Sequence, residues 1–439
     1  MAVSEKYSQL KANQREAIGL LSVGTFLEYF DLLLYVHMSV LLNELFFPKT
    51  DSRTTALLSA FAFCSSYVLR PFGALIFGYI GDNIGRKATV IITTILMSIS
   101  CFTMANLPTY EQIGISAAYI VTACRIVQGM SSMGEVIAAD LYITELTKPP
   151  VQYPAVTLIA IFGVLGGTCA LGLATLVTSF GFNWRNAFWF GALIAVVGGV
   201  ARTRLRETPE FVDAKRRIKS AIIETNNDTT LLKKNAIWNE KVNKKTALSL
   251  FFIECSWPVC FYFTYIYCGN ILKETFNFSS EEVIHQNFAV STIQLFSWFI
   301  LAYLSYVIYP LKIIKVRLWI FLAFILALPF LLNNLTSPYQ IMFIQCVIVV
   351  FGFMGTPAIP IFYKHFPIFK RFTYATFTYA LSRAFIYVIT SFGLVYFSSF
   401  FGHYVVLVVM LPTAALFRYG IYHFEMLERI SESPTYDKK

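Results

Sequence analysis

Charged residues are scarce in this chain of 439 residues. Aspartate, glutamate, lysine and arginine together make up 14% of it, whereas hydrophobic residues make up 56%. A typical soluble domain carries roughly 25% charged residues, and a water-soluble protein of this size could not bury so much apolar surface. The composition therefore excludes a purely soluble protein and predicts a polytopic membrane protein with little soluble mass.

Patterns that bind metals, phosphates or cofactors are also missing. The eight cysteines fall within or beside apolar runs and show no metal-ligand spacing. We interpret them as small buried hydrophobic residues without a disulfide framework. The sequence holds no Walker-type phosphate loop, catalytic triad or zinc pattern. We therefore expect neither an enzyme nor an ATP-driven pump, and we expect no cofactor and no metal.

Long apolar stretches recur along the chain, separated by short polar breaks. Each is about 20 residues long, which is the length that a helix needs to cross a bilayer. We predict an all-α membrane protein with twelve transmembrane helices. The predicted spans are 17–42, 54–80, 88–107, 112–140, 154–179, 186–203, 246–271, 286–309, 317–334, 339–362, 372–398 and 402–424.

One long polar segment, 204–245, separates the first six spans from the last six. Its content of lysine, arginine, asparagine, threonine and glutamate is typical of a solvated linker. The predicted organisation is an N-terminal six-helix unit at 1–203, a cytoplasmic linker at 204–245, and a C-terminal six-helix unit with a short tail at 246–439.

The positive charges predict the orientation of the chain. Most of the 35 lysine and arginine residues fall in segments that share one side of the membrane, and only Lys49, Arg53, Arg185 and Lys273 fall in loops on the other side. Because cytoplasmic loops are enriched in these residues, we expect both termini in the cytoplasm. The net charge of +10 is then a topology signal, and we do not expect nucleic-acid binding.

The turn between the second and third predicted spans reads "GYIGDNIGRK". Gly78 and Gly85 would let two helices and a tight turn approach closely. Asp82, Arg86 and Lys87 crowd the same turn. An acid there could cap a neighbouring helix or pair with a base, and so hold two helix bundles in one state. We predict a cytoplasmic gate motif at these five residues.

This turn resembles the loop signature of the major facilitator superfamily, G-x-x-x-D-R-x-G-R-K, with Asn83 in place of its first arginine. The fourth span contains "RIVQGMSSMGEV", which is similar to the R-x-x-Q-G-x-x-x-G-G-E stretch of the metabolite:proton symporters of that superfamily, with Met133 in place of one glycine. The stretch "EYFD" in the first span is similar to their E-W-Y-D. The resemblance extends over residues 24–211 and is weaker beyond them.

The resemblance implies two six-helix bundles around a central cavity that opens to one side of the membrane at a time. It also implies a multi-pass protein of a bacterial inner membrane that acts as a monomer. Its partners would be the lipid bilayer, protons, and a small solute such as betaine, proline or a carboxylate metabolite. Two alternatives stay open: an uncoupled facilitator or exchanger, and a transporter-like sensor that binds solute without moving it.

Charged residues inside the spans are costly and are therefore candidates for function. Glu28 and Asp31 lie one turn apart on one face of the first span, and Arg125 lies at a similar depth in the fourth. Burial favours the neutral form of a carboxyl group, whereas a nearby guanidinium favours the charged form. Motion that changes their separation could therefore load and unload a proton. We predict that these three residues couple transport to protons; a static pair that locks the two spans together is the alternative.

Three further acids lie toward the inner end of the fourth span. Glu135 is a candidate for a second proton site or for part of the cytoplasmic gate with Arg86. We interpret Asp140 and Glu145 as gate or surface charges.

Four other residues are candidates for solute binding. Gln128 could hydrogen-bond the solute or join two helices. Arg383 could bind a solute carboxylate as a bidentate fork, or it could pair with Glu254 or with backbone carbonyl groups. Trp257 and Tyr265 could present aromatic faces to a quaternary ammonium group, although aromatic residues are common throughout a chain with 42 phenylalanines and 25 tyrosines.

Overall fold

The structure is a computed structural model of the whole chain. It describes residues 10, 12–38, 42, 45–47, 67–181, 183–203, 212, 213, 216, 240–390, 397 and 400–432.

Helices make up nearly all of the regular structure of the described residues. In the first half of the chain these are α1 (Ala12–His37), α4 (Arg70–Asn83), α5 (Arg86–Asn106), α6 (Tyr110–Ile113), α7 (Ile115–Leu146), α8 (Gln152–Phe180) and α9 (Trp184–Arg202). In the second half they are α13 (Lys244–Glu254), α14 (Ser256–Phe261), the π-helix η1 (Tyr262–Tyr267), α15 (Cys268–Phe276), α16 (Ser280–Val307), α17 (Pro310–Asn333), α18 (Pro338–Phe351), α19 (Ile359–Tyr363), α20 (Ile368–Val388), the 3-10 helix η3 (Gly402–Tyr404) and α22 (Val405–Glu432).

Seven of the described helical segments are long and apolar enough to cross a membrane. Two long helices, α7 with 32 residues and α20 with 21, are not among the seven. These two helices carry Arg125 and Arg383, and both arginines are buried within the protein. The repeated apolar helices confirm the prediction of a multi-pass, all-helical membrane protein.

Parts of the predicted pattern lie outside the described residues or differ from the prediction. The second predicted span is described only from residue 67, and most of the linker at 204–245 lies outside the described residues. The predicted span 339–362 is interrupted, because α18 ends at Phe351 and α19 begins at Ile359. Glycine and proline between them, in "GFMGTPA", disfavour a continuous helix.

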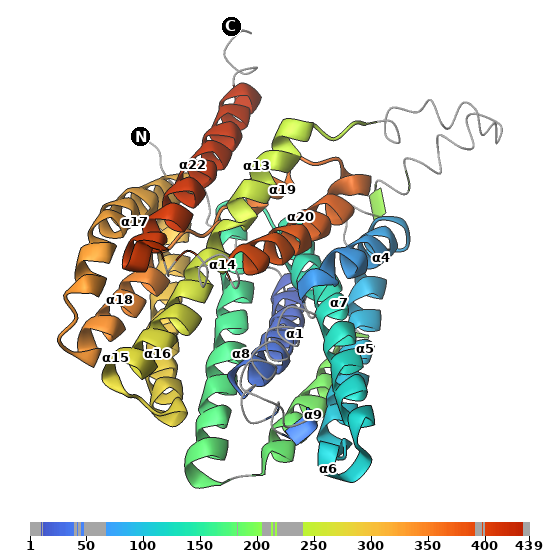
Figure 1. The fold of residues 1–439 in the computed structure, drawn as a ribbon. Coiled ribbons are helices and arrows are strands. Elements are labelled where there is room, and N and C mark those ends of the chain that lie inside the picture. Colours follow the sequence, from blue (N-terminus) through green and yellow to red (C-terminus); the bar gives the residue numbers. More distant parts are fainter. Residues whose placement is uncertain are drawn as a thin grey trace, which may run out of the picture.

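Two helix pairs make the most extensive contacts between the halves of the sequence. The helices α8 and α16 pack along one another, and so do α4 and α20. Figure 1 shows α4, α20 and the start of α13 at one end of the molecule, and α6 at the opposite end. Side chains at the α4–α20 contact can therefore respond to movement of one half against the other.

A close approach of α1 and α8 brings α1 up to the centre of the molecule. Gly166 of α8 faces the backbone of α1, where an added Cβ would lie 2.2 Å from the carbonyl oxygen of Phe26. Gly163, one turn earlier, faces the ring of Tyr29. These small residues allow the close helix packing that the glycine-rich sequence of α8 favours.

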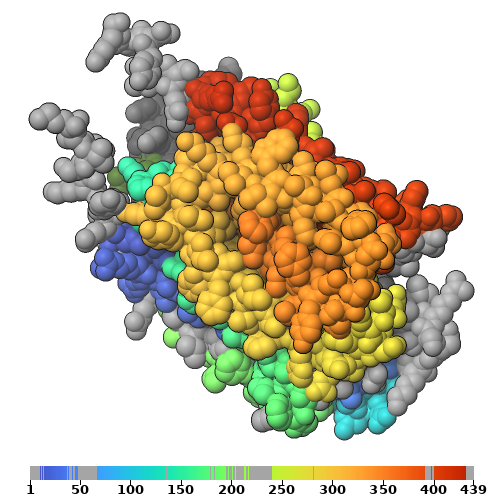
Figure 2. All heavy atoms as spheres, turned by 90° about the vertical axis from the view of Figure 1, so that its left-hand side faces the viewer, coloured from blue at the N-terminus to red at the C-terminus, as the bar shows by residue number. Residues whose placement is uncertain are grey.

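The outer surface of the second half is apolar. Figure 2 shows a face built from the helices α15 to α18. Large side chains stand exposed on these helices, among them Phe296 at 65%, Trp319 at 53% and Phe330 at 70% exposure. In a membrane protein such side chains contact lipid chains, so this surface agrees with the apolar spans.

Candidate functional site

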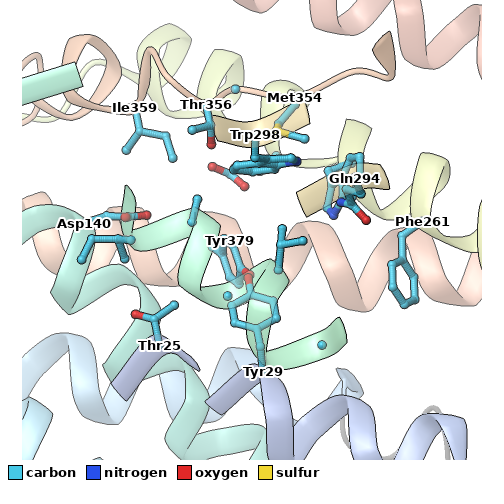
Figure 3. A pocket seen from close by; sticks show the side chains of 18 of the residues that line it. Thr25, Tyr29, Asp140, Phe261, Gln294, Trp298, Met354, Thr356, Ile359 and Tyr379 are labelled. Atoms are coloured by element: carbon cyan, nitrogen blue, oxygen red, sulfur yellow. The ribbon is translucent and has the colours of Figure 1, made fainter. Parts of the chain in front are cut away.

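One internal cavity is lined by side chains from both halves of the sequence (Figure 3). The empty space in and around it, with the open solvent at its mouth included, is about 1060 Å³. The polar and aromatic lining residues are Thr25, Tyr29, Asp140, Glu254, Trp257, Phe261, Tyr265, Ser291, Gln294, Trp298, Thr356, Tyr363, Tyr379 and Arg383.

An ion pair stands in the wall of this cavity. Arg383 of α20 donates from Nη1 to Oε2 of Glu254 at 2.8 Å, and the two side chains are only 9% and 11% exposed. The guanidinium also lies 3.2 Å from the centroid of the Tyr379 ring. Of the roles predicted for Arg383, the geometry contains the pairing with Glu254 and also contacts with backbone carbonyl oxygens, those of Glu254 at 3.3 Å and Tyr379 at 3.4 Å. Glu254 neutralises most of the charge that a solute carboxylate would meet there.

Two tyrosines meet across the cavity. The hydroxyl oxygens of Tyr29 on α1 and Tyr379 on α20 lie 3.2 Å apart, and Figure 3 shows the two side chains directed toward one another. This hydrogen bond connects the two halves of the sequence. It would have to break if the halves moved apart at this point.

Aromatic side chains form a large part of the cavity wall. Trp257 and Tyr265, both predicted as solute contacts, line it, and so does Trp298 of α16. Tyr265 lies in the π-helix η1, a type of turn that is frequent at functional sites. Its hydroxyl donates to Oε1 of Gln294 at 2.8 Å. Sequence reasoning missed Trp298 and Gln294, because nothing distinguishes their positions within the apolar run of α16.

Asp140 of α7 lines the cavity and is only 6% exposed. Our sequence interpretation made it a gate or surface charge at the end of a span. The helix α7 continues to Leu146, so Asp140 lies more than a turn inside the helix end. Figure 3 shows it at the opposite end of the cavity from Phe261 and Gln294.

The predicted proton-coupling residues form a separate buried network. Gln128 donates from Nε2 to Oδ2 of Asp31 at 2.5 Å, and its Oε1 accepts from Nη1 of Arg125 at 3.2 Å. Asp31 and Arg125 are 0% and 1% exposed, and neither is among the residues that line the cavity. The amide of Gln128 thus bridges the two charges, whereas we expected Arg125 to pair with an acid directly.

The other two predicted coupling residues, Glu28 and Glu135, belong to the helices α1 and α7. Glu28 is buried at 2% exposure and is not among the residues that line the cavity. Glu135 belongs to α7, but its side chain lies outside what the structure describes.

The predicted gate motif joins α4 to α20. Asp82 accepts hydrogen bonds from the backbone N–H groups of Phe372 and Thr373 at 3.2 and 2.8 Å, and from the Thr373 hydroxyl at 2.7 Å. Gly78 allows this contact, because an added Cβ would lie 2.9 Å from the Cα of Thr373. Gly85 has φ of 146°, a conformation that favours glycine.

Arg86 completes the junction and is fully buried. Its Nη2 donates to Oε1 of Glu145 at 3.1 Å and to the carbonyl oxygen of Ile368 at 3.0 Å. Arg371 donates to the same Glu145 oxygen at 3.4 Å. We call Asp82, Arg86, Glu145, Arg371 and Thr373 the latch.

Lys87, also predicted for the gate motif, lies beside the latch. It donates from Nζ to the carbonyl oxygen of Thr203 at 2.9 Å. This contact connects α5 to the end of the first half.

Comparison with known proteins places this architecture among transporters. Residues 21–394 match the family model described as Major Facilitator Superfamily. The chain is 32% identical over 204 residues to the proline/betaine transporter of Escherichia coli K12, covering 45% of this chain and 41% of that protein. It is also 32% identical over 227 residues to the inner membrane metabolite transport protein YhjE of the same strain, covering 49% of this chain and 51% of that protein. The matches thus span about half or less of these relatives.

The fold is similar to that of a solved transporter over nearly its whole length. The proton:xylose symporter XylE, bound to 6-bromo-6-deoxy-D-glucose, superimposes with a TM-score of 0.72 at 13% identity. The match covers 95% of this chain and 96% of that one.

Proposed function

This chain belongs to the major facilitator superfamily, a family of membrane transporters and not of enzymes, and we propose that it is a proton-coupled symporter of a small organic solute. The solute class is betaine, proline or a carboxylate metabolite, and the mechanism is alternating access. The similarity to a proline/betaine transporter over 204 residues, 45% of the chain, supports this class.

The proposed topology has twelve membrane-spanning helices in two six-helix bundles. The bundles are residues 1–203 and 246–439, joined by a cytoplasmic linker at 204–245. Both termini lie in the cytoplasm, and the protein acts as a monomer in the bacterial inner membrane. The packing of α4 on α20 and of α8 on α16, which joins the two halves of the sequence, supports this division.

The single observation that carries the mechanism is a cavity lined by both halves together with a latch across the same halves. The latch closes the molecule at the α4–α20 contact, through Asp82 and Arg86. If the latch opens, the halves separate there and the cavity meets the water on that side. When the latch closes again, the cavity opens to the opposite side of the membrane. Alternating access requires this cycle.

The chemistry of the cavity suits a solute with a quaternary or secondary ammonium group. Trp257, Tyr265 and Trp298 line the wall, and aromatic faces attract such cations. Asp140 adds a carboxyl group at one end. A neutral sugar would make no use of these charges, whereas a zwitterion such as betaine would.

Proton coupling rests on the bridge between Asp31, Gln128 and Arg125. The amide of Gln128 connects the Asp31 carboxylate to the Arg125 guanidinium by hydrogen bonds. A small movement of α1 against α7 therefore alters how well the carboxylate is stabilised. A buried carboxylate that loses such support binds a proton more readily. We therefore assign the coupling role to Asp31.

Uptake by the purified protein in sealed vesicles tests this function. Under an imposed pH gradient, we expect the wild type to accumulate one of betaine, proline, 2-oxoglutarate, citrate or shikimate. Asp31→Asn should only equilibrate that solute, whereas the exposed control Asp213→Asn should accumulate it as the wild type does. Accumulation by Asp31→Asn would remove Asp31 from the coupling step.

Two results would favour the alternatives. Equilibration without accumulation by the wild type would indicate a facilitator or exchanger. Binding without flux would indicate a sensor.

A further inference from the structure

Two buried arginines lie beside the cavity with much of their hydrogen-bonding capacity unused. Arg70 of α4 is 3% exposed and Arg125 of α7 is 1% exposed. The Nε and Nη2 atoms of both side chains are buried without a hydrogen-bond partner among the described residues. A buried guanidinium with unmade hydrogen bonds is costly, so these four N–H positions call for an acceptor.

Tyrosines enclose the two guanidinium groups. Arg70 lies 4.3 Å from the centroid of the Tyr67 ring, and Arg125 lies 4.2 Å from that of Tyr35. The helices that carry the two arginines, α4 and α7, pack against one another, and Gly73, three residues after Arg70, faces the backbone of Met130 on α7. Two cations held near one another between aromatic rings, without direct hydrogen bonds to an acid among the described residues, form a region of positive potential.

The charge balance at Arg70 and Arg125 differs from that at Arg383, a buried arginine that lines the cavity. Arg383 has Glu254 as a direct partner at 2.8 Å. Arg125 reaches Asp31 only through Gln128, and among the described residues no acid pairs with Arg70. Among the described residues, neither Arg70 nor Arg125 therefore has the direct carboxylate partner that Arg383 has.

We propose that Arg70 and Arg125 together form an anion site that binds a carboxylate. A carboxylate offers two oxygens and about four lone-pair directions, which suit two guanidinium forks better than a single spherical ion does. The tyrosine rings exclude water and strengthen the charged hydrogen bonds. This assignment rests in part on the proposed function, because the carboxylate belongs to the transported solute or to a separate small anion that accompanies it.

An aromatic pair separates this site from the cavity. The rings of Tyr67 and Tyr387 lie 4.4 Å apart, and Tyr387 packs against Phe261 at 6.5 Å between centroids. Phe261 lines the cavity, and Tyr387 follows the cavity residue Arg383 by one turn of α20. Rotation of the Tyr387 side chain would therefore connect the cavity to the arginine pair.

Equilibrium binding of acetate to the purified full-length protein in detergent tests the site, because it requires neither a gradient nor flux. Calorimetry should give saturable binding that weakens about 10- to 100-fold in Arg70→Gln and in Arg125→Gln, since each removes charged hydrogen bonds. The control Arg429→Gln, which changes an arginine with 76% side-chain exposure, should bind as the wild type does. Arg70→Lys and Arg125→Lys keep the charge but lose the fork, so they should fold and bind with intermediate affinity.

Each outcome decides the proposal. Equal acetate affinity in the wild type and both glutamine variants would overturn it, and so would chloride binding as tightly as acetate. Competition between betaine and acetate supports the site and identifies the solute as the source of the carboxylate. Acetate binding without such competition also supports the site and assigns it to a separate anion. Acetate binding that persists while vesicles show no coupled uptake would refute the proposed function and leave this site intact.

Discussion

The latch offers a direct way to shift the protein between its two states. Asp82 is 4% exposed and accepts three hydrogen bonds from α20. Asn at this position has nearly the same size, but it keeps one acceptor oxygen and turns an NH₂ group toward the remaining donors. Hydrogen bonds to a charged group contribute about 1.5–3 kcal/mol each. We expect Asp82→Asn to weaken the latched state by about 3 kcal/mol, which is roughly a 150-fold change in the ratio of latched to open molecules.

Distance measurements between spin labels can follow this shift. Labels at Ile84→Cys and Met426→Cys, both exposed in the structure, would report the separation of α4 from α22 after the eight native cysteines are replaced. The labelled protein that keeps Asp82 should give mainly one distance between the labels. The Asp82→Asn variant should show a second, different distance as well. The neighbouring control Asn83→Ala should leave the distribution unchanged, because Asn83 bonds only within its own helix, to Tyr79. Identical distributions for Asp82 and Asp82→Asn would refute the role assigned to the latch.

Two further predictions concern stability. Arg383→Gln leaves Glu254 buried without its cation, so thermal unfolding in detergent should show a loss of about 3–5 kcal/mol, and adding Glu254→Gln should recover part of it; an additive loss in the double variant would contradict a coupled pair. Gly166→Ala forces a Cβ toward the carbonyl oxygen of Phe26 at 2.2 Å and should cost about 1–3 kcal/mol. Gly19→Ala is its control, because among the described residues no atom beyond its own turn of helix lies within 4 Å of the added Cβ, and equal melting temperatures for the two alanine variants would disprove the packing argument.

Much of the gate could be predicted from short-range sequence features. Gly85 adopts a conformation that favours glycine, and Asp82 and Arg86 both act at the contact between α4 and α20. We interpreted Glu145 as a gate or surface charge, but its pairing with Arg86 could not be predicted, and Thr373 carries no distinguishing pattern and lies far away in the chain. Glu254 was one of the partners that we expected for Arg383, and only the structure selected it.

The sequence by itself determined that the chain is a helical membrane protein. Its apolar runs have the length of a bilayer, and in lipid a helix satisfies all the backbone hydrogen bonds of such a run within the run itself. It also determined which spans carry buried charge, since such charges are rare and stand out from their surroundings. Only the tertiary structure decided that Gln128 bridges Asp31 and Arg125, that Asp140 and Trp298 line the cavity, and that Arg70 lies near Arg125. The physical reason is that lipid and protein interior are both apolar, so hydrophobicity does not indicate which face of a membrane helix meets a neighbour and which meets the bilayer.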